Sequence, residues 1–198
     1  MARKLIIEGP VESNLKELTQ LVCGIDLTTV DRLATAIAER ATGESVIYLF
    51  GNGGSAAIAE HFALDLERIA NDNRRRVQIR PLSLVGSSVR LTADANDYGF
   101  DHVFSRQLEA YLKPNDIAVG ITASGASGNV VEALRVAHER QVFTVVLTRA
   151  DETPADSWCD LSLKIPATVP ALLETVFSCA LYLVSERIRA ILANAAVA

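Results

Sequence analysis

The sequence predicts an α/β fold in which a parallel sheet is covered by helices on both faces. Short apolar, β-branched runs alternate along the chain with segments of helical apolar spacing. Two glycine- and serine-rich loops each follow such a run and precede a helical segment. The 198 residues, 49% of them hydrophobic, suffice for one domain with a sizeable core.

The first forty residues are predicted to be helical. The helical pattern covers residues 11–40, with a break near Cys23-Gly24-Ile25-Asp26. Thr28-Thr29-Val30-Asp31 is typical of a second helix start, and Gly43 is expected to stop that helix.

The rest of the chain is predicted as strands and helices in alternation. The expected strands are 46–50, 81–85, 117–121, 142–147 and 161–165. The expected helices are 55–70, 87–95, 100–112, 128–140 and 170–192, and 71–80 is expected to be a loop. Turns are expected at 96–99, 113–116 and 151–154. Ligands of open parallel sheets lie at the carboxyl ends of the strands, where both serine-bearing loops fall.

Composition and charge exclude several classes of protein. A net charge of −5 argues against a basic nucleic-acid surface, so no direct contact with nucleic acid is expected. Arg74-Arg75-Arg76 is interpreted as a solvated loop, the alternative being a phosphate or subunit contact. The three cysteines lack metal-site spacing, which favours reduced thiols in the cytoplasm. No signal peptide or membrane span is expected, because charged residues interrupt the apolar stretch 169–192.

The two loops predict a phosphorylated small-molecule ligand. They are Phe50-Gly51-Asn52-Gly53-Gly54-Ser55-Ala56-Ala57 and Thr122-Ala123-Ser124-Gly125-Ala126-Ser127-Gly128-Asn129. Such turns offer backbone N–H groups and hydroxyls at a helix N-terminus, which suits phosphate. Ordinary tight turns are the alternative interpretation of both. Ala56 stands where a dinucleotide fingerprint needs its last glycine, and a P-loop lysine is missing, so no nucleotide cofactor is expected.

Two helical patterns offer candidate chemistry. His61 and Asp65 share one helix face, where they could hold a metal, form an acid/base pair or simply pair at the surface. Polar residues at helical spacing mark the last helix, and this stripe could face either water or a cleft. Its members are Glu174, Ser178, Tyr182 and Ser185.

The residues of the loops resemble the sugar isomerase (SIS) domain family, of the phosphoheptose isomerase type. The resemblance rests on Gly51-Asn52-Gly53-Gly54-Ser55-Ala56-Ala57 with His61, on the block from Leu91 to Gln107, and on Gly120 to Val130. It implies a single SIS domain with a five-stranded parallel sheet, in which residues 1–42 form a helical segment used in oligomerisation and 43–198 the α/β core. It also implies a cytoplasmic homotetramer with ligand sites at subunit interfaces, and aldose–ketose isomerisation of sedoheptulose 7-phosphate.

The resemblance assigns substrate-binding roles residue by residue. The matching positions are Asn52, Gly53, Ser55, Asp97, Thr122, Ser124 and Ser127. Ala123 and Ala126 depart from the family pattern, which has Thr and Asn there. His61 matches a metal ligand, and Asp65 stands where the family has its catalytic Glu, with a side chain about 1.5 Å shorter.

The last helix departs further, because the family carries there a Gln and, eight residues later, a His. An alignment without gaps from Pro166 places Glu174 and Tyr182 at these positions, and it is preferred because it turns the polar stripe toward the cleft. The other alignment places Leu173 and Leu181 there, which would leave a site that binds a phosphosugar without converting it.

The leading hypothesis is an isomerase that works through an enediol. Asp65 would be the base, Glu174 or Tyr182 with His61 would polarise the carbonyl, and His61, Asp65 and Glu174 could hold zinc. The rival hypothesis is a non-catalytic protein, either a phosphosugar sensor or a scaffold resembling the DnaA initiator-associating protein.

Overall fold

A computed structural model describes residues 10–72 and 78–195 of the chain. The strands are β1 (Thr42–Gly51), β2 (Gln78–Ser83), β3 (Ile117–Ile121), β4 (Phe143–Arg149) and β5 (Leu161–Ile165). The α-helices are α1 (Pro10–Cys23), α2 (Leu27–Glu39), α3 (Gly53–Asp72), α4 (Ser88–Tyr98), α5 (Ser105–Tyr111), α6 (Gly128–Glu139) and α7 (Pro170–Ala195). Two 3-10 turns are η1 (Phe100–His102) and η2 (Pro154–Trp158). The predicted arginine cluster at 74–76 lies outside the described residues.

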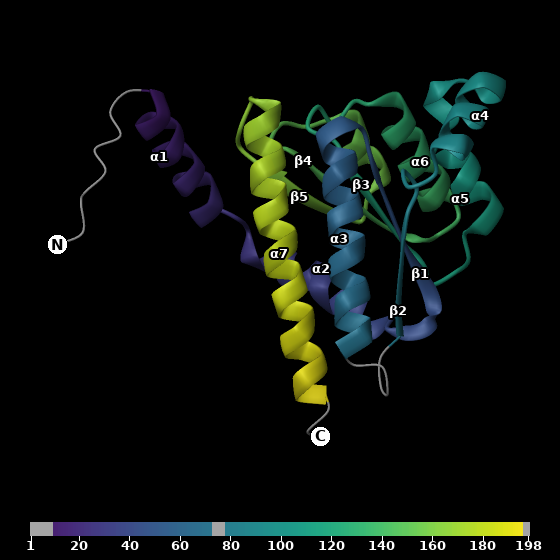
Figure 1. Cartoon of the computed structure of the whole chain (residues 1–198), viewed down its shortest axis with the longest axis horizontal. Helices are drawn as coiled ribbons and strands as arrows, with labels where there is room; N and C mark the ends of the chain where they lie inside the picture. Colours follow the sequence, from purple (N-terminus) through teal and green to yellow (C-terminus); the bar gives the residue numbers. More distant parts are fainter. Residues whose placement is uncertain (1–9, 73–77, 196–198) are drawn as a thin grey trace.

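The strands form one five-stranded parallel sheet in the order β2-β1-β3-β4-β5, which confirms the predicted fold class. The central strand β3 is apolar and buried along its whole length, as a strand covered on both faces must be. Because every strand runs the same way, the loops after β1 and β3 emerge at the same edge of the sheet (Figure 1).

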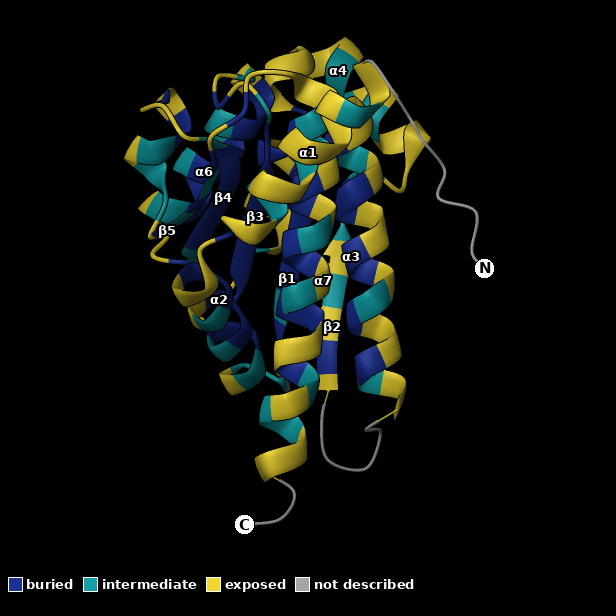
Figure 2. Cartoon of the chain, turned by 90° about the vertical axis from the view of Figure 1, so that its left-hand side faces the viewer, coloured by how far each residue is buried: buried dark blue, intermediate teal, exposed yellow. Residues whose placement is uncertain are grey.

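Helices cover both faces of the sheet. Helices α2, α3 and α7 pack with one apolar cluster, which includes Leu49, Val119 and Leu147. Helices α5 and α6 pack with a second cluster on the other face, which includes Tyr48 and Val146. Figure 2 shows the inner strands as the buried layer, whereas the edge strand β2 and the outer faces of the helices are largely exposed. Consecutive residues of a strand thus pack into the clusters on opposite faces of the sheet, because side chains alternate in direction along a strand.

The second strand both begins and ends earlier than the predicted 81–85, because it covers Gln78–Ser83 and leaves Leu84 and Val85 outside the strand. The polar character of residues 78–80 predicts a loop, but β2 begins at Gln78 and pairs with β1 through Arg80 and Pro81. An edge strand tolerates both the polar residues and the proline, because one of its sides forms no hydrogen bonds with a neighbouring strand and the N–H that proline lacks is not needed there.

The segment after β2 also differs from the prediction. Helix α4 extends to Tyr98, so residues 96–98 of the expected turn are helical. Gly99 caps the helix with a φ of 90°, a conformation that suits glycine. The helix expected over 100–112 is instead η1 followed by α5, because Val103 and Phe104 turn into the core between the two. The last helix was predicted correctly. Pro170 is its first residue, a position where the N–H group that proline lacks would have no partner within the helix. Of the helices that the structure describes, none combines the length and the apolar character that crossing a membrane requires.

Candidate active site

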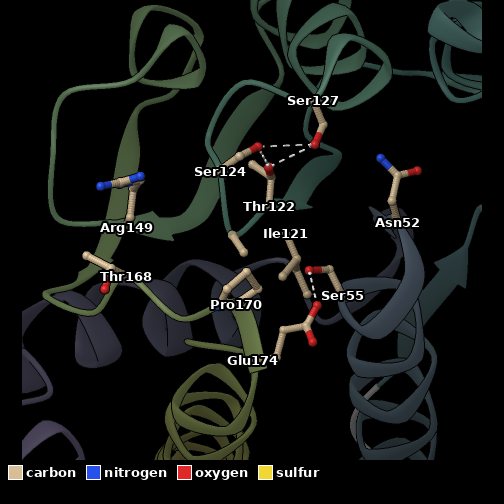
Figure 3. Close-up of a pocket in the computed structure, with 11 residues that line it drawn as sticks. Asn52, Ser55, Ile121, Thr122, Ser124, Ser127, Arg149, Thr168, Pro170 and Glu174 are labelled. Atoms are coloured by element: carbon tan, nitrogen blue, oxygen red, sulfur yellow. Dashed lines mark hydrogen bonds between the residues drawn. The ribbon is translucent and has the colours of Figure 1, made fainter. Parts of the chain in front are cut away.

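A cavity of about 280 Å³ opens at the carboxyl ends of β1, β3 and β4 (Figure 3). Both predicted loops contribute to it, and so does the start of α7. Its lining residues are Asn52, Ser55, Ile121, Thr122, Ala123, Ser124, Ser127, Arg149, Thr168, Pro170 and Glu174. Five of the seven predicted substrate-binding residues therefore line one cavity.

Three hydroxyls form a cluster on the wall of this cavity. The Oγ1 of Thr122 lies 3.1 Å from Ser127 Oγ and 3.3 Å from Ser124 Oγ. Backbone N–H groups donate to two of them, from Gly125 to Thr122 Oγ1 and from Ala126 to Ser124 Oγ. Hydroxyl hydrogens serve the bonds within the cluster, and a hydroxyl that turns from its neighbour toward a ligand can donate to a phosphate oxygen.

Glu174 enters the same cavity from α7. Ser55 Oγ donates to its Oε1 at 3.2 Å, and a Cβ at Gly54 would overlap with the carboxylate. The carboxylate thus lies against the first turn of α3, where the helix dipole favours a negative charge. Leu173 and Leu181 point into the core, so α7 turns Glu174 toward the cavity, as the preferred alignment of the last helix supposes.

The two loops are joined directly by their asparagines. Asn52 Nδ2 donates to Asn129 Oδ1 at 2.8 Å, and Asn129 Nδ2 donates back to Asn52 Oδ1 at 2.9 Å. Asn52 precedes α3 and Asn129 belongs to the first turn of α6, so this pair links helices that cover opposite faces of the sheet.

A second network supports the hydroxyl loop from behind. Gly125 has a φ of 67°, and a Cβ there would overlap with Thr153. Thr153 donates its N–H and its hydroxyl to Asp156 Oδ2, which also accepts from Lys164 at 3.0 Å. Burial alone would raise the pKa of Asp156, but the hydrogen bonds from Lys164, Thr153 and Ser162 outweigh it and hold that pKa below its ordinary value.

His61 and Asp65 lie in a separate hollow between α3 and α7, of about 90 Å³. Ser178 and Tyr182 line it as well, so the polar stripe of α7 contributes to two neighbouring spaces. His61 Nε2 is 3.8 Å from Asp65 Oδ2, and Arg68 donates to Asp65 Oδ1 at 3.3 Å. The structure therefore brings the predicted pair together, with Tyr182 beside it.

The predicted zinc set of His61, Asp65 and Glu174 does not converge. Glu174 lines the hydroxyl cavity and not the hollow of the other two. Within residues 10–72 and 78–195, no three His, Cys, Asp or Glu side chains gather as metal ligands would. One protomer thus offers two donors where catalytic zinc takes three from protein, so the residues present do not fit that ion.

Three further predicted residues lie outside the hydroxyl cavity. Gly53, with a φ of 54°, lines an apolar hollow of about 570 Å³ beside Phe100. Asp97 is exposed near the end of α4, where Asn96 donates to its Oδ1 at 2.8 Å. Ser185, the last member of the polar stripe, is buried in the molecule.

The sequence reasoning missed four residues of this region. Arg149 ends β4, and extending that predicted strand from 147 to 149 would have placed a cation at the ligand edge. Gly54 and Asn129 stand in the loop motifs, but their contacts depend on α7 and on the opposite loop. Thr168 lies between β5 and α7, and no local pattern marks it.

Comparisons with known proteins agree with this architecture. Residues 13–149 match the model of the SIS domain. The phosphoheptose isomerase of Rhodospirillum rubrum is 40% identical over 143 residues, which are 68% of this chain and 74% of that protein. The phosphoheptose isomerase of a Bradyrhizobium species is 34% identical over 171 residues, 86% of this chain and 85% of that one.

A solved structure shows the same likeness in three dimensions. The phosphoheptose isomerase GmhA from Neisseria gonorrhoeae superposes with a TM-score of 0.79 at 30% identity, covering 90% of this chain and 94% of that one. The chain belongs to the SIS domain family and, within it, to the phosphoheptose isomerases.

Proposed function

We propose that the protein is an aldose–ketose isomerase acting on sedoheptulose 7-phosphate or a closely related phosphorylated sugar. The observation that carries the proposal is one cavity that combines a phosphate-type hydroxyl cluster with a carboxylate, that of Glu174. The relatives of this chain are phosphoheptose isomerases, which gives the substrate class.

The proposed reaction moves one proton between neighbouring carbons. A carboxylate takes the proton from C1 of the ketose, the electron pair forms the C1=C2 double bond of an enediol, and the carbonyl oxygen at C2 gains a proton. Return of a proton to C2 and loss of the proton on O1 give the aldose. The hydroxyls of Thr122, Ser124 and Ser127 would hold the phosphate, and Asn52 and Ser55 would contact the sugar.

Within one protomer, Glu174 is the carboxylate within reach of a ligand held by the hydroxyl cluster. Asp65 lies ten residues beyond Ser55 on α3, about 15 Å along the helix axis. A seven-carbon phosphate is only about 10 Å long, from carbon–carbon bonds of about 1.5 Å. We therefore propose Glu174 as the proton-transferring group. The roles of Asp65 as base and of His61 and Tyr182 at the carbonyl stay predictions.

We also propose a homotetramer in the cytoplasm. Helix α1 is amphipathic, has no buried residue and contacts α7, while Val11 and Leu15 remain exposed. These properties support the role of the N-terminal segment in oligomerisation. Asp97 lies outside its own protomer's cavity, so it could contact substrate only in a neighbouring one. The three free cysteines support a reducing compartment.

The test of the proposed function is an isomerase assay on sedoheptulose 7-phosphate followed by NMR in deuterated water, with and without added zinc. We expect deuterium at the carbon that receives the returning proton, together with formation of the aldose. Binding of the sugar phosphate without exchange under either condition would contradict the proposal and favour a phosphosugar sensor. Comparing the two arms also tests the predicted zinc.

A further inference from the structure

Arg149 is the one cationic side chain among the described residues that line the hydroxyl cavity. It is the last residue of β4 and projects to the same sheet face as Leu147, two residues earlier. Glu174 reaches the cavity from α7, which covers that face. In Figure 3, Arg149 and Thr168 lie on one side of the cavity and Asn52 on the other, with the three hydroxyls between them.

The guanidinium of Arg149 has hydrogen-bonding capacity left over. One terminal nitrogen pairs with Asp151, whose side chain is 67% exposed. The Nε atom is buried and has no hydrogen-bond partner among the described residues. A buried donor without a partner is costly, and a rotation of the guanidinium that turned Nε toward a ligand oxygen would relieve that cost.

The charges around the cavity show which ligand group Arg149 suits. The hydroxyls are neutral, so among the described residues of the lining Glu174 and Arg149 alone are charged. Without Arg149, an incoming phosphate would meet neutral donors and one carboxylate that repels it. Guanidinium groups match phosphate oxygens in geometry and keep their charge at every physiological pH.

We propose that Arg149 is the cationic partner of the phosphate and makes this cavity select phosphate esters in their doubly charged form. The inference rests on the proposed function for the identity of the sugar. The binding of a phosphate ester by Arg149 does not depend on that function. Arg149 is a specificity-determining residue in this scheme, because it acts on the phosphate and not on the reacting carbons.

The test measures binding of ethyl phosphate by calorimetry at pH 5 and pH 7.5, on either side of the second pKa of a phosphate monoester, near 6. We expect the intact protein to bind more tightly at pH 7.5. Arg149→Gln should weaken binding at pH 7.5 by about ten- to hundredfold, the usual effect of losing a charged hydrogen bond. The preference for the higher pH should largely disappear.

Two further variants separate a binding role from a structural one. Arg149→Lys keeps the charge and should recover a large part of the lost affinity. Arg187→Gln removes a positive charge far along α7, where Arg187 pairs with Asp31, and should leave phosphate binding unchanged. Unchanged binding by Arg149→Gln at both pH values would overturn the proposal. So would a loss that lysine does not rescue and that accompanies a lower melting temperature of the ligand-free protein.

Kinetics with sedoheptulose 7-phosphate complete the test. Arg149→Gln should raise KM by about ten- to hundredfold and leave kcat within about threefold, because the phosphate is bound in both ground and transition states. If the intact protein shows no isomerisation but its ethyl phosphate binding still depends on Arg149, the proposed function fails and this inference holds. If the intact protein isomerises the sugar and Arg149→Gln leaves KM unchanged, the proposed function holds and the inference about Arg149 fails.

Discussion

The carboxylate of Glu174 is held by two neighbours, the hydroxyl of Ser55 and the glycine backbone at the start of α3. The resemblance places a Gln at this position in the family, so the present chain has a negative charge where an amide is expected. A carboxylate can accept a proton and an amide cannot. At the residue scale, this difference supports our proposal that Glu174, in place of the predicted Asp65, is the base.

Replacing Glu174 by Gln tests that assignment directly. Glu174→Gln keeps the size of the side chain and should lower kcat by about 10²- to 10⁴-fold, the usual contribution of a general base. Asp65→Asn should cost less than about tenfold, and Glu186→Gln, on an exposed part of α7, should have no effect. Steady-state kinetics by NMR measure all three. A large loss in Asp65→Asn with a small one in Glu174→Gln would restore Asp65 as the base.

Asp156 predicts a pH-dependent contribution to stability. Its pKa is below the ordinary value in the folded protein, so its stabilisation is complete above the unfolded pKa, near 4, and is lost as the pH falls through the folded pKa. Asp156→Asn should lower the free energy of unfolding by about 2 kcal/mol at pH 7, because it weakens the bonds from Thr153 and Lys164.

Urea denaturation at several pH values checks this expectation. The gap between Asp156→Asn and the unchanged protein should begin to shrink below about pH 4, where the unfolded carboxylate takes up a proton, and should close below the folded pKa, where the carboxylate is neutral in both states. Glu152→Gln, at an exposed residue of the same loop, serves as the control. A gap that stays constant down to the lowest pH would contradict the role of the charge.

At the scale of elements, both helices that follow the serine loops meet a carboxylate of the same chain at their first turn. A Cβ at Gly54 in α3 would overlap with Glu174, and one at Gly128 in α6 would overlap with Asp101. These glycines are needed for close approach, because neither has a positive φ. A negative charge is favoured at a helix N-terminus, so the place of each carboxylate agrees with the helix dipole, and anion binding by the loops stays a prediction.

Gly54→Ala should therefore disturb function more than folding. Alanine is a better helix former than glycine, and the group that it displaces is the flexible end of Glu174. We expect an unchanged or slightly higher melting temperature and a loss of kcat comparable to that of Glu174→Gln. In the Glu174→Gln background the same change should add little. Fully additive losses in the double variant would show that Gly54 acts by another route.

The elements with a strong periodic pattern were predictable from the sequence, and those defined by tertiary contacts were not. The strand β3 is a short apolar run between turn signals, and α7 has a long helical apolar pattern. Gln78 and Arg80 carry no apolar signal, since the pairing with β1 alone makes them a strand. The split between η1 and α5 depends on Phe104, whose burial needs a core formed by distant segments.

At the scale of the whole molecule, the site depends on residues that the fold brings together from four stretches of the chain, 52–55, 121–127, 149 and 168–174. The hydroxyls of the second loop could be predicted as site residues, because Thr122, Ser124 and Ser127 lie in one short stretch of the sequence. Arg149 and Glu174 reach the cavity from different elements, so only the sheet order and the packing of α7 place them there. For the same reason, the separation of Glu174 from His61 and Asp65 could not be predicted from helical spacing alone.

Helix α1 gives the prediction for assembly. It contacts α7 and has exposed Val11 and Leu15, which an oligomer would cover. Leu15→Asp should convert the expected tetramer into smaller species on light scattering after size exclusion, whereas Glu17→Gln on the same helix should not. A single-chain mass for the unchanged protein would show that these apolar residues have no oligomeric role.

The reciprocal amide pair of Asn52 and Asn129 has a consequence for the thermodynamics of binding. It fixes the two loops against each other before any ligand arrives, so the conformational entropy of ordering them is lost during folding and not during association. Both partners are uncharged, so this preorganisation persists across the whole pH range in which phosphate changes its charge. The ligand therefore meets a scaffold of constant shape, on which only the charges respond to acidity.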